Sequence, residues 1–137
     1  MTTTVTGTPN KANKGMILGG RIVSALPVLG LLMSASMKLT HAPQLVTQFV
    51  GTLGYPETAM TPIGVVELLS ALLYAVPQTS VLGALLLTGY LGGAVATHVR
   101  VGEGFGPPIF LGILVWLGLF LRDERIRALL PLRKLPA

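Results

Sequence analysis

One acidic side chain, Glu67, lies in the middle of a long apolar stretch of the sequence, IGVVELLSALLYA. A charge inside a hydrocarbon layer is costly, so such a residue is normally paired or placed where a ligand, proton or ion reaches it. Two interpretations of Glu67 stay open at this point. It forms a structural ion pair with Lys38, His98 or Arg100, or it is a carboxylate that handles protons or binds a ligand. Tyr74 lies seven positions after Glu67, so a helix places both on one face.

A second group of polar residues closes the stretch SVLGALLLTGYLGGAVATHVRVG. It contains Thr97, His98 and Arg100. Histidine can shuttle protons or donate a hydrogen bond to a quinone carbonyl, although it is also common at an ordinary helix end. Arg100 and Lys38 can hold an oxyanion, or they can simply anchor their helices at the interface.

These residues form the candidate site. We expect Glu67 and His98 to be the catalytic pair. The expected ligand-binding residues are Lys38, Arg100, Thr97, Tyr74 and Ser34. We expect no metal site, because cysteine is absent and the only other histidine, His41, lies in a loop.

The composition is that of a membrane protein. Of 137 residues, 51% are hydrophobic and 11% are charged, whereas about 25% are charged in a soluble domain. The net charge is +5, but no basic patch with interleaved aromatic residues exists, which argues against nucleic-acid binding. Without cysteine, redox chemistry must use a bound cofactor such as a quinone, or a partner protein.

The apolar pattern predicts an all-α fold, a four-helix transmembrane bundle. A short helix at the membrane interface is expected between the first and second spans, because Pro43 suits a helix start and Leu45, Phe49 and Leu53 follow at helical spacing. The bundle, residues 16–121, is flanked by a disordered polar tail, 1–15, and a basic cytoplasmic tail, 122–137. The four spans are expected at about 16–37, 59–77, 79–99 and 107–121.

Small residues in the third span create a thin helix face. Gly89 and Gly93 are four positions apart, so another helix backbone or a ligand can approach them closely. This face predicts contacts central to the bundle, and it is the candidate surface for a homo-oligomer.

The charges predict the orientation in the bilayer. Basic residues gather in both tails, whereas the opposite side has only Lys38 and Arg100. The positive-inside rule then places both termini in the cytoplasm, which indicates a multi-pass protein of a bacterial inner membrane. In this topology Glu67, His98 and the two basic residues share the outer half of the bundle, with Ser34 one turn below Lys38.

Several segments of the sequence resemble the DoxX-like family of small bacterial integral membrane proteins. They are ASMKLTHAPQ, LGYP, PIGVVELLSALLYAVPQTSVLGALLLTGYLGGAVATHVRVG and LFLRDERIRALLPLR. The resemblance implies a four-helix transmembrane bundle and a redox neighbourhood. Some relatives form the membrane part of thiosulfate:quinone oxidoreductase, and others are linked to oxidative-stress assemblies. The polar positions shared by the family fall on Lys38, Glu67, Thr97, His98 and Arg100.

Three functions compete on this basis. The favoured one is a redox-associated, quinone-linked membrane subunit that binds a small molecule in the outer half of the bundle, with a redox partner protein. The second is a small-molecule or ion transporter that works as an oligomer, with Glu67 as the coupling site. The third is a non-catalytic membrane partner or chaperone that uses the Gly89/Gly93 face. Whether the protein is an enzyme stays open.

Overall fold

The computed structural model describes residues 11–136, and this part of the chain contains helices and no strands. The four main helices are α1 (Lys11–Leu39), α3 (Met60–Ala75), α4 (Ser80–Val101) and α5 (Gly106–Arg122). The segments 13–39, 57–75 and 77–101 are long and apolar enough to cross a membrane, and α5 is a shorter apolar helix. The predicted all-α, four-helix membrane bundle is therefore confirmed.

The helix bounds differ from the expected spans mainly at the two ends of the chain. Helix α1 begins at Lys11 instead of residue 16, and the rest of the expected N-terminal tail, 1–10, lies outside the described residues. The expected C-terminal tail contains a further helix, α6 (Glu124–Leu129), whose first turn is capped by the Asp123 side chain. Helix α1 also continues through Pro27, which is buried.

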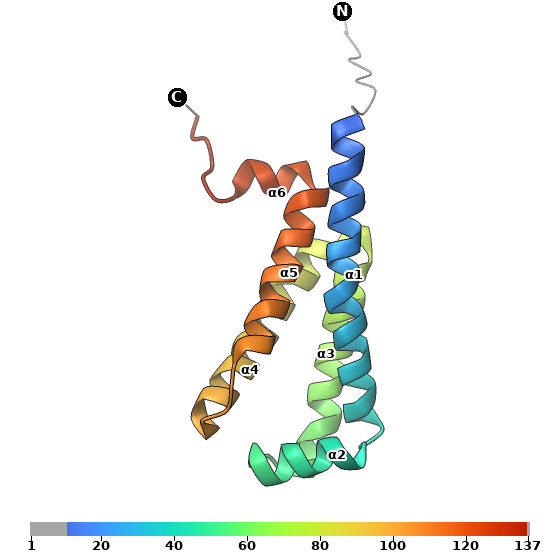
Figure 1. Cartoon of the computed structure of the whole chain (residues 1–137), viewed down its shortest axis with the longest axis vertical. Helices are drawn as coiled ribbons and strands as arrows, with labels where there is room; N and C mark the ends of the chain where they lie inside the picture. The colour runs from blue at the N-terminus through green and yellow to red at the C-terminus, as the bar shows by residue number, and fades with distance from the viewer. Residues whose placement is uncertain (1–10, 137) are drawn as a thin grey trace, which may run out of the picture.

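The four main helices form a ring in which each helix packs mainly against two others, in the order α1, α3, α4, α5. Figure 1 shows both described chain ends at the same end of this bundle, here named the terminal end. At the opposite end, here named the α2 end, the connection between α1 and α3 crosses below these two helices (Figure 1). It consists of α2 (Pro43–Val46), the π-helical segment η1 (Thr47–Thr52) and the 3₁₀ turn η2 (Glu57–Ala59).

Glycines bring the helices into close contact at the terminal end. An added Cβ at Gly83 of α4 would lie 2.2 Å from the Tyr74 backbone nitrogen, across the 3₁₀ turn η3 (Pro77–Thr79). A Cβ at Gly118 of α5 would lie 2.9 Å from the Ser24 backbone nitrogen of α1. These positions accept no side chain, so they fix the helix spacing at this end.

The thin face of α4, formed by Gly89 and Gly93, does not pack closely against another helix. A Cβ at Gly89 or Gly93 would meet no atom within 4 Å outside its own helix. Within the described chain, this face therefore contacts no neighbouring helix, and the close contact predicted for it lies instead at Gly83.

Candidate ligand-binding cavity

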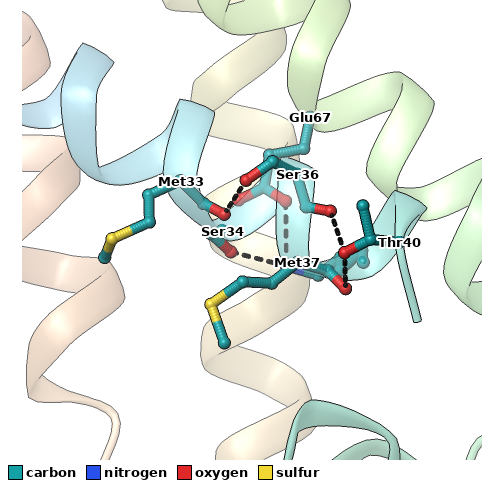
Figure 2. A network of polar contacts seen from close by, with 7 residues as sticks. Met33, Ser34, Ser36, Met37, Thr40 and Glu67 are labelled. Atoms are coloured by element: carbon teal, nitrogen blue, oxygen red, sulfur yellow. Dashed lines mark hydrogen bonds and ion pairs between the residues drawn. The ribbon is translucent and has the colours of Figure 1, made fainter. Parts of the chain in front are cut away.

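Glu67 and Lys38 form an ion pair between α3 and α1. The Lys38 Nζ atom donates to Glu67 Oε2 at 2.8 Å and to the Ser34 hydroxyl at 2.7 Å (Figure 2). Glu67 is 1% exposed and Lys38 is 9% exposed. A pair this well buried is held by its mutual attraction and by hydrogen bonds that compensate for lost hydration. The partner of Glu67 is thus Lys38, rather than His98 or Arg100.

The sequence around the pair explains how the helices approach. Ser34 lies one helical turn before Lys38, so both side chains project from the same side of α1. Gly64 lies one turn before Glu67 on α3, and a Cβ there would come within 3.0 Å of the Lys38 Cβ. Gly64 therefore gives the lysine stem the space to reach across to the carboxylate.

A cavity of about 450 Å³ opens beside this pair, between α1, α3 and α4 and above the α2–η1 connection. The thin face of α4, formed by Gly89, Gly93 and Ala94, makes one wall. The lining residues are Ser34, Lys38, Leu45, Gln48, Phe49, Leu53, Tyr55, Ile63, Gly89, Tyr90, Gly93, Ala94, Thr97 and His98. A mostly apolar cavity with a few convergent polar groups is typical of a small-molecule site.

Lys38, and not Glu67, is the charged group that faces the cavity. Glu67 is buried and does not line it. Tyr90, on the α4 wall, lies close enough to interact with the Glu67 carboxylate. The carboxylate therefore holds the Lys38 side chain in place, and Lys38 is the member of the pair that lines the cavity.

Tyr55 closes the cavity between η1 and α4. Its hydroxyl shares a hydrogen bond of 2.8 Å with the Thr97 hydroxyl. Its ring lies 5.1 Å from the Phe49 ring and 5.6 Å from the Arg100 guanidinium carbon. Arg100 also donates to the Leu53 carbonyl, and this hydrogen bond links the α1–α3 connection to the end of α4. Arg100 does not line the cavity.

The two histidines lie in separate polar clusters. His98 lines the cavity, and its Nδ1 atom is 3.0 Å from Glu103 Oε2 in the loop after α4. His41 lies outside the cavity and contacts Glu57 Oε1 and the Thr61 hydroxyl, each at 3.0 Å. Within residues 11–136, no three His, Asp or Glu side chains gather as metal ligands do.

Tyr74 lies away from the cavity, near the terminal end of the bundle. Its hydroxyl forms hydrogen bonds with the Ser24 hydroxyl (2.9 Å) and with the Val115 carbonyl (2.7 Å). Tyr74 shares a helix face with Glu67, but seven residues of helix separate them by about 10 Å along the axis. Tyr74 is buried in the core, and it lines a different cavity at the terminal end.

Four of the seven expected site residues therefore line one cavity: Ser34, Lys38, Thr97 and His98. Tyr55 and Tyr90 also line the cavity, although the list of expected site residues does not include them. The available signal for Tyr90 was its position between Gly89 and Gly93 on the thin face. The signal for Tyr55 was weaker, because its role depends on the path of a loop.

The sequence model of the DoxX-like family matches residues 22–119. The match begins within α1, includes all of α3 and α4 and extends into α5. No curated protein and no solved structure matches the chain. Since the matched residues form most of the sequence and include the whole cavity lining, this protein belongs to the DoxX-like family.

Proposed function

We propose that this membrane protein binds a small carbonyl compound of the quinone class in the cavity at the α2 end, as the membrane subunit of a redox assembly. The observation that carries the proposal is that Lys38, whose ammonium group is bonded to Ser34 and Glu67, lines a mostly apolar cavity. An ionisable group inside a membrane is costly, so the position of Lys38 in the lining of a cavity favours a role in binding.

The lysine has a donor available for a ligand. An ammonium group has three N–H donors, and two of them are directed to the Ser34 hydroxyl and the Glu67 carboxylate. The third can donate to a carbonyl oxygen in the cavity. As that oxygen gains negative charge on reduction, its hydrogen bond to an ammonium group strengthens.

The volume and the lining of the cavity suit a planar ring with an apolar tail. Its volume of about 450 Å³ falls within the range of roughly 300–1,000 Å³ found for small-molecule sites. Gly89 and Gly93 leave one wall thin, and Phe49 with Leu45 provides an apolar floor. These surfaces bind the ring and exclude water, whereas Lys38 sets the ring's orientation.

The remaining polar groups support proton exchange. Reduction of a quinone to a hydroquinone takes up two electrons and two protons. His98 lines the cavity and contacts Glu103 outside it, so this pair offers a path for a proton between the ligand and the surface. The electrons would come from a partner protein, because the chain has no cysteine for thiol or iron–sulfur chemistry.

The orientation in the membrane forms part of the same proposal. Eight of the ten basic residues belong to residues 11–21 and 122–134, the two segments of the sequence that lead to the terminal end. The positive-inside rule favours that end for the cytoplasm of a bacterial inner membrane. The cavity would then face the outer half of the bilayer.

The test is the identification of a bound molecule. The protein is purified gently, and extracted compounds are compared by mass spectrometry and absorbance for the wild type, Glu67→Gln and Glu57→Gln. Glu57 is the matched control, because its carboxylate is exposed and pairs with His41 outside the cavity. A short-chain naphthoquinone is added in a parallel titration.

The proposal expects a quinone in the wild type and in Glu57→Gln, and its loss from Glu67→Gln. If the wild type neither carries a quinone nor binds the added one, the quinone assignment is wrong. If Glu67→Gln retains the compound as well as the control does, the Lys38–Glu67 pair is not its binding site.

A further inference from the structure

A second cavity, of about 340 Å³, lies at the terminal end of the bundle. It is bounded by α1, the end of α3 and the end of α5, and it shares no lining residue with the first cavity. Two arginines line it, Arg21 from α1 and Arg122 from α5. Nothing in the proposed quinone chemistry uses these residues.

Arg122 has an incomplete set of partners. One of its terminal nitrogens donates to the Tyr74 carbonyl at 3.5 Å and to the Ser80 hydroxyl at 3.3 Å, which are long hydrogen bonds. Its guanidinium carbon lies 5.1 Å from the Tyr74 ring centroid. Its Nε atom is buried and has no hydrogen-bond partner. A buried donor without an acceptor is costly, so such an atom calls for an explanation.

No carboxylate in the described chain compensates for the two arginines. Among residues 11–136, neither Arg21 nor Arg122 forms an ion pair, although five other pairs exist. The nearby acidic residues are engaged elsewhere: Asp123 pairs with Arg125 at 3.6 Å, and Glu124 pairs with Arg127 at 3.6 Å. Two arginines thus line the cavity, and these acidic residues supply no counter-charge to them.

We propose that this second cavity binds a phosphate-bearing anion between Arg21 and Arg122. A guanidinium group matches a phosphate with two parallel N–H donors, and the two hydrogen bonds that Arg122 makes within the protein are long. The Ser24 side chain, which also lines the cavity, adds a hydroxyl near the same place. Basic pockets between membrane helices bind lipid headgroups in this way.

The apolar part of the cavity favours a phospholipid headgroup over free phosphate as the source of the anion. Ala25 and Val28 continue the cavity wall along α1, away from the helix start. An acyl chain can follow this wall while the phosphate stays between the arginines. Inorganic phosphate would use only the arginine end.

The test measures anion binding to the full-length protein in a neutral detergent. Thermal unfolding is followed during titration with phosphatidylglycerol, phosphatidylcholine or inorganic phosphate. The main variant is Arg21→Gln, because Arg21 is exposed and forms no hydrogen bond within residues 11–136, so its loss should not impair folding. Arg125→Gln is the control, because that side chain is 93% exposed and lies outside the cavity. Arg122→Lys is a second variant that keeps the charge but removes the paired donors.

We expect phosphatidylglycerol to raise the unfolding temperature of the wild type. Arg21→Gln should weaken its apparent affinity about fivefold, the effect of one basic residue near an anionic headgroup, and Arg125→Gln should leave it unchanged. Arg122→Lys should also weaken binding, because lysine lacks the paired donors. Equal stabilisation by inorganic phosphate, with the same loss in Arg21→Gln, would identify a soluble phosphate as the ligand.

Two results would overturn the proposal. The first is that none of the three additives stabilises the wild type. The second is an equal loss of affinity in Arg21→Gln and Arg125→Gln, because that result indicates a diffuse attraction to the basic end and no defined site.

Discussion

The two ends of the bundle treat charge in opposite ways. At the α2 end, three acidic residues meet three basic partners in the pairs Lys38–Glu67, His98–Glu103 and His41–Glu57. At the terminal end, eight basic residues face two acidic ones in the sequence. Under the two proposals above, each end therefore suits a different ligand. The compensated end suits an amphipathic molecule that takes a hydrogen bond, and the uncompensated end suits an anion.

The two ends also use glycine differently. Gly83 and Gly118, near the terminal end, leave no space for a Cβ, whereas Gly89 and Gly93 line open space. Glycine therefore allows close helix packing at the terminal end, whereas at the α2 end it lines a cavity. A glycine's role in a membrane helix depends on what faces it.

The largest effect is expected from removing one member of the buried pair. Glu67→Ala leaves the Lys38 charge buried without its partner, which costs about 3–5 kcal/mol of stability. The double variant Lys38→Met, Glu67→Leu replaces the pair with apolar side chains of similar size and should recover most of that loss. Thermal unfolding in detergent measures both. A double variant as unstable as Glu67→Ala would show that the pair does more than balance its own charges.

The next largest effect is expected at the closed end. Gly83→Ala should destabilise the protein by about 3 kcal/mol, because the new Cβ would overlap the Tyr74 backbone and force the α3–α4 turn apart. The matched change at the open end, Gly93→Ala, should leave stability unchanged or raise it by about 0.5 kcal/mol, since alanine is the better helix former. Equal losses in the two variants would contradict the distinction between the ends.

A smaller effect is expected where the cavity is closed. Tyr55→Phe removes the hydrogen bond to Thr97 but keeps the ring contacts with Phe49 and Arg100. The loss of stability should be about 1 kcal/mol, and the bound molecule should leave faster, because η1 is held less firmly against α4. Ligand dissociation rates measure the second effect. A rate equal to that of the wild type would remove Tyr55 from the closure of the cavity.

The sequence predicts the helices well because their signal is local. Long apolar runs bounded by Pro, Gly and polar residues define α1, α3 and α4, and Pro107 with Pro108 begins α5. The sequence also predicts that Lys38 and His98 lie at the same end of the bundle, because they end the first and the third span and these two spans run in the same direction. Both lines of reasoning need only the chain order and the length of a helix.

The pairing of side chains could not be predicted in the same way. Lys38, His98 and Arg100 were equal candidates for Glu67, and the choice depends on how closely α1 approaches α3 at Gly64. The role of Gly89 and Gly93 depends likewise on whether another helix packs against α4 at these positions, which the sequence does not specify. Tyr74 shares a face with Glu67 but reaches a different layer of the bundle, because a helical face extends along the whole helix.

The most direct test of the cavity as a ligand site is to fill it without touching its charges. Gly93→Leu places a side chain into the cavity, and Gly92→Leu places the same side chain on an exposed part of α4 outside the lining. The measurement is the affinity for a short-chain naphthoquinone in each purified variant. The account predicts that Gly93→Leu loses binding while Gly92→Leu keeps the wild-type affinity. Unchanged binding in Gly93→Leu would contradict it.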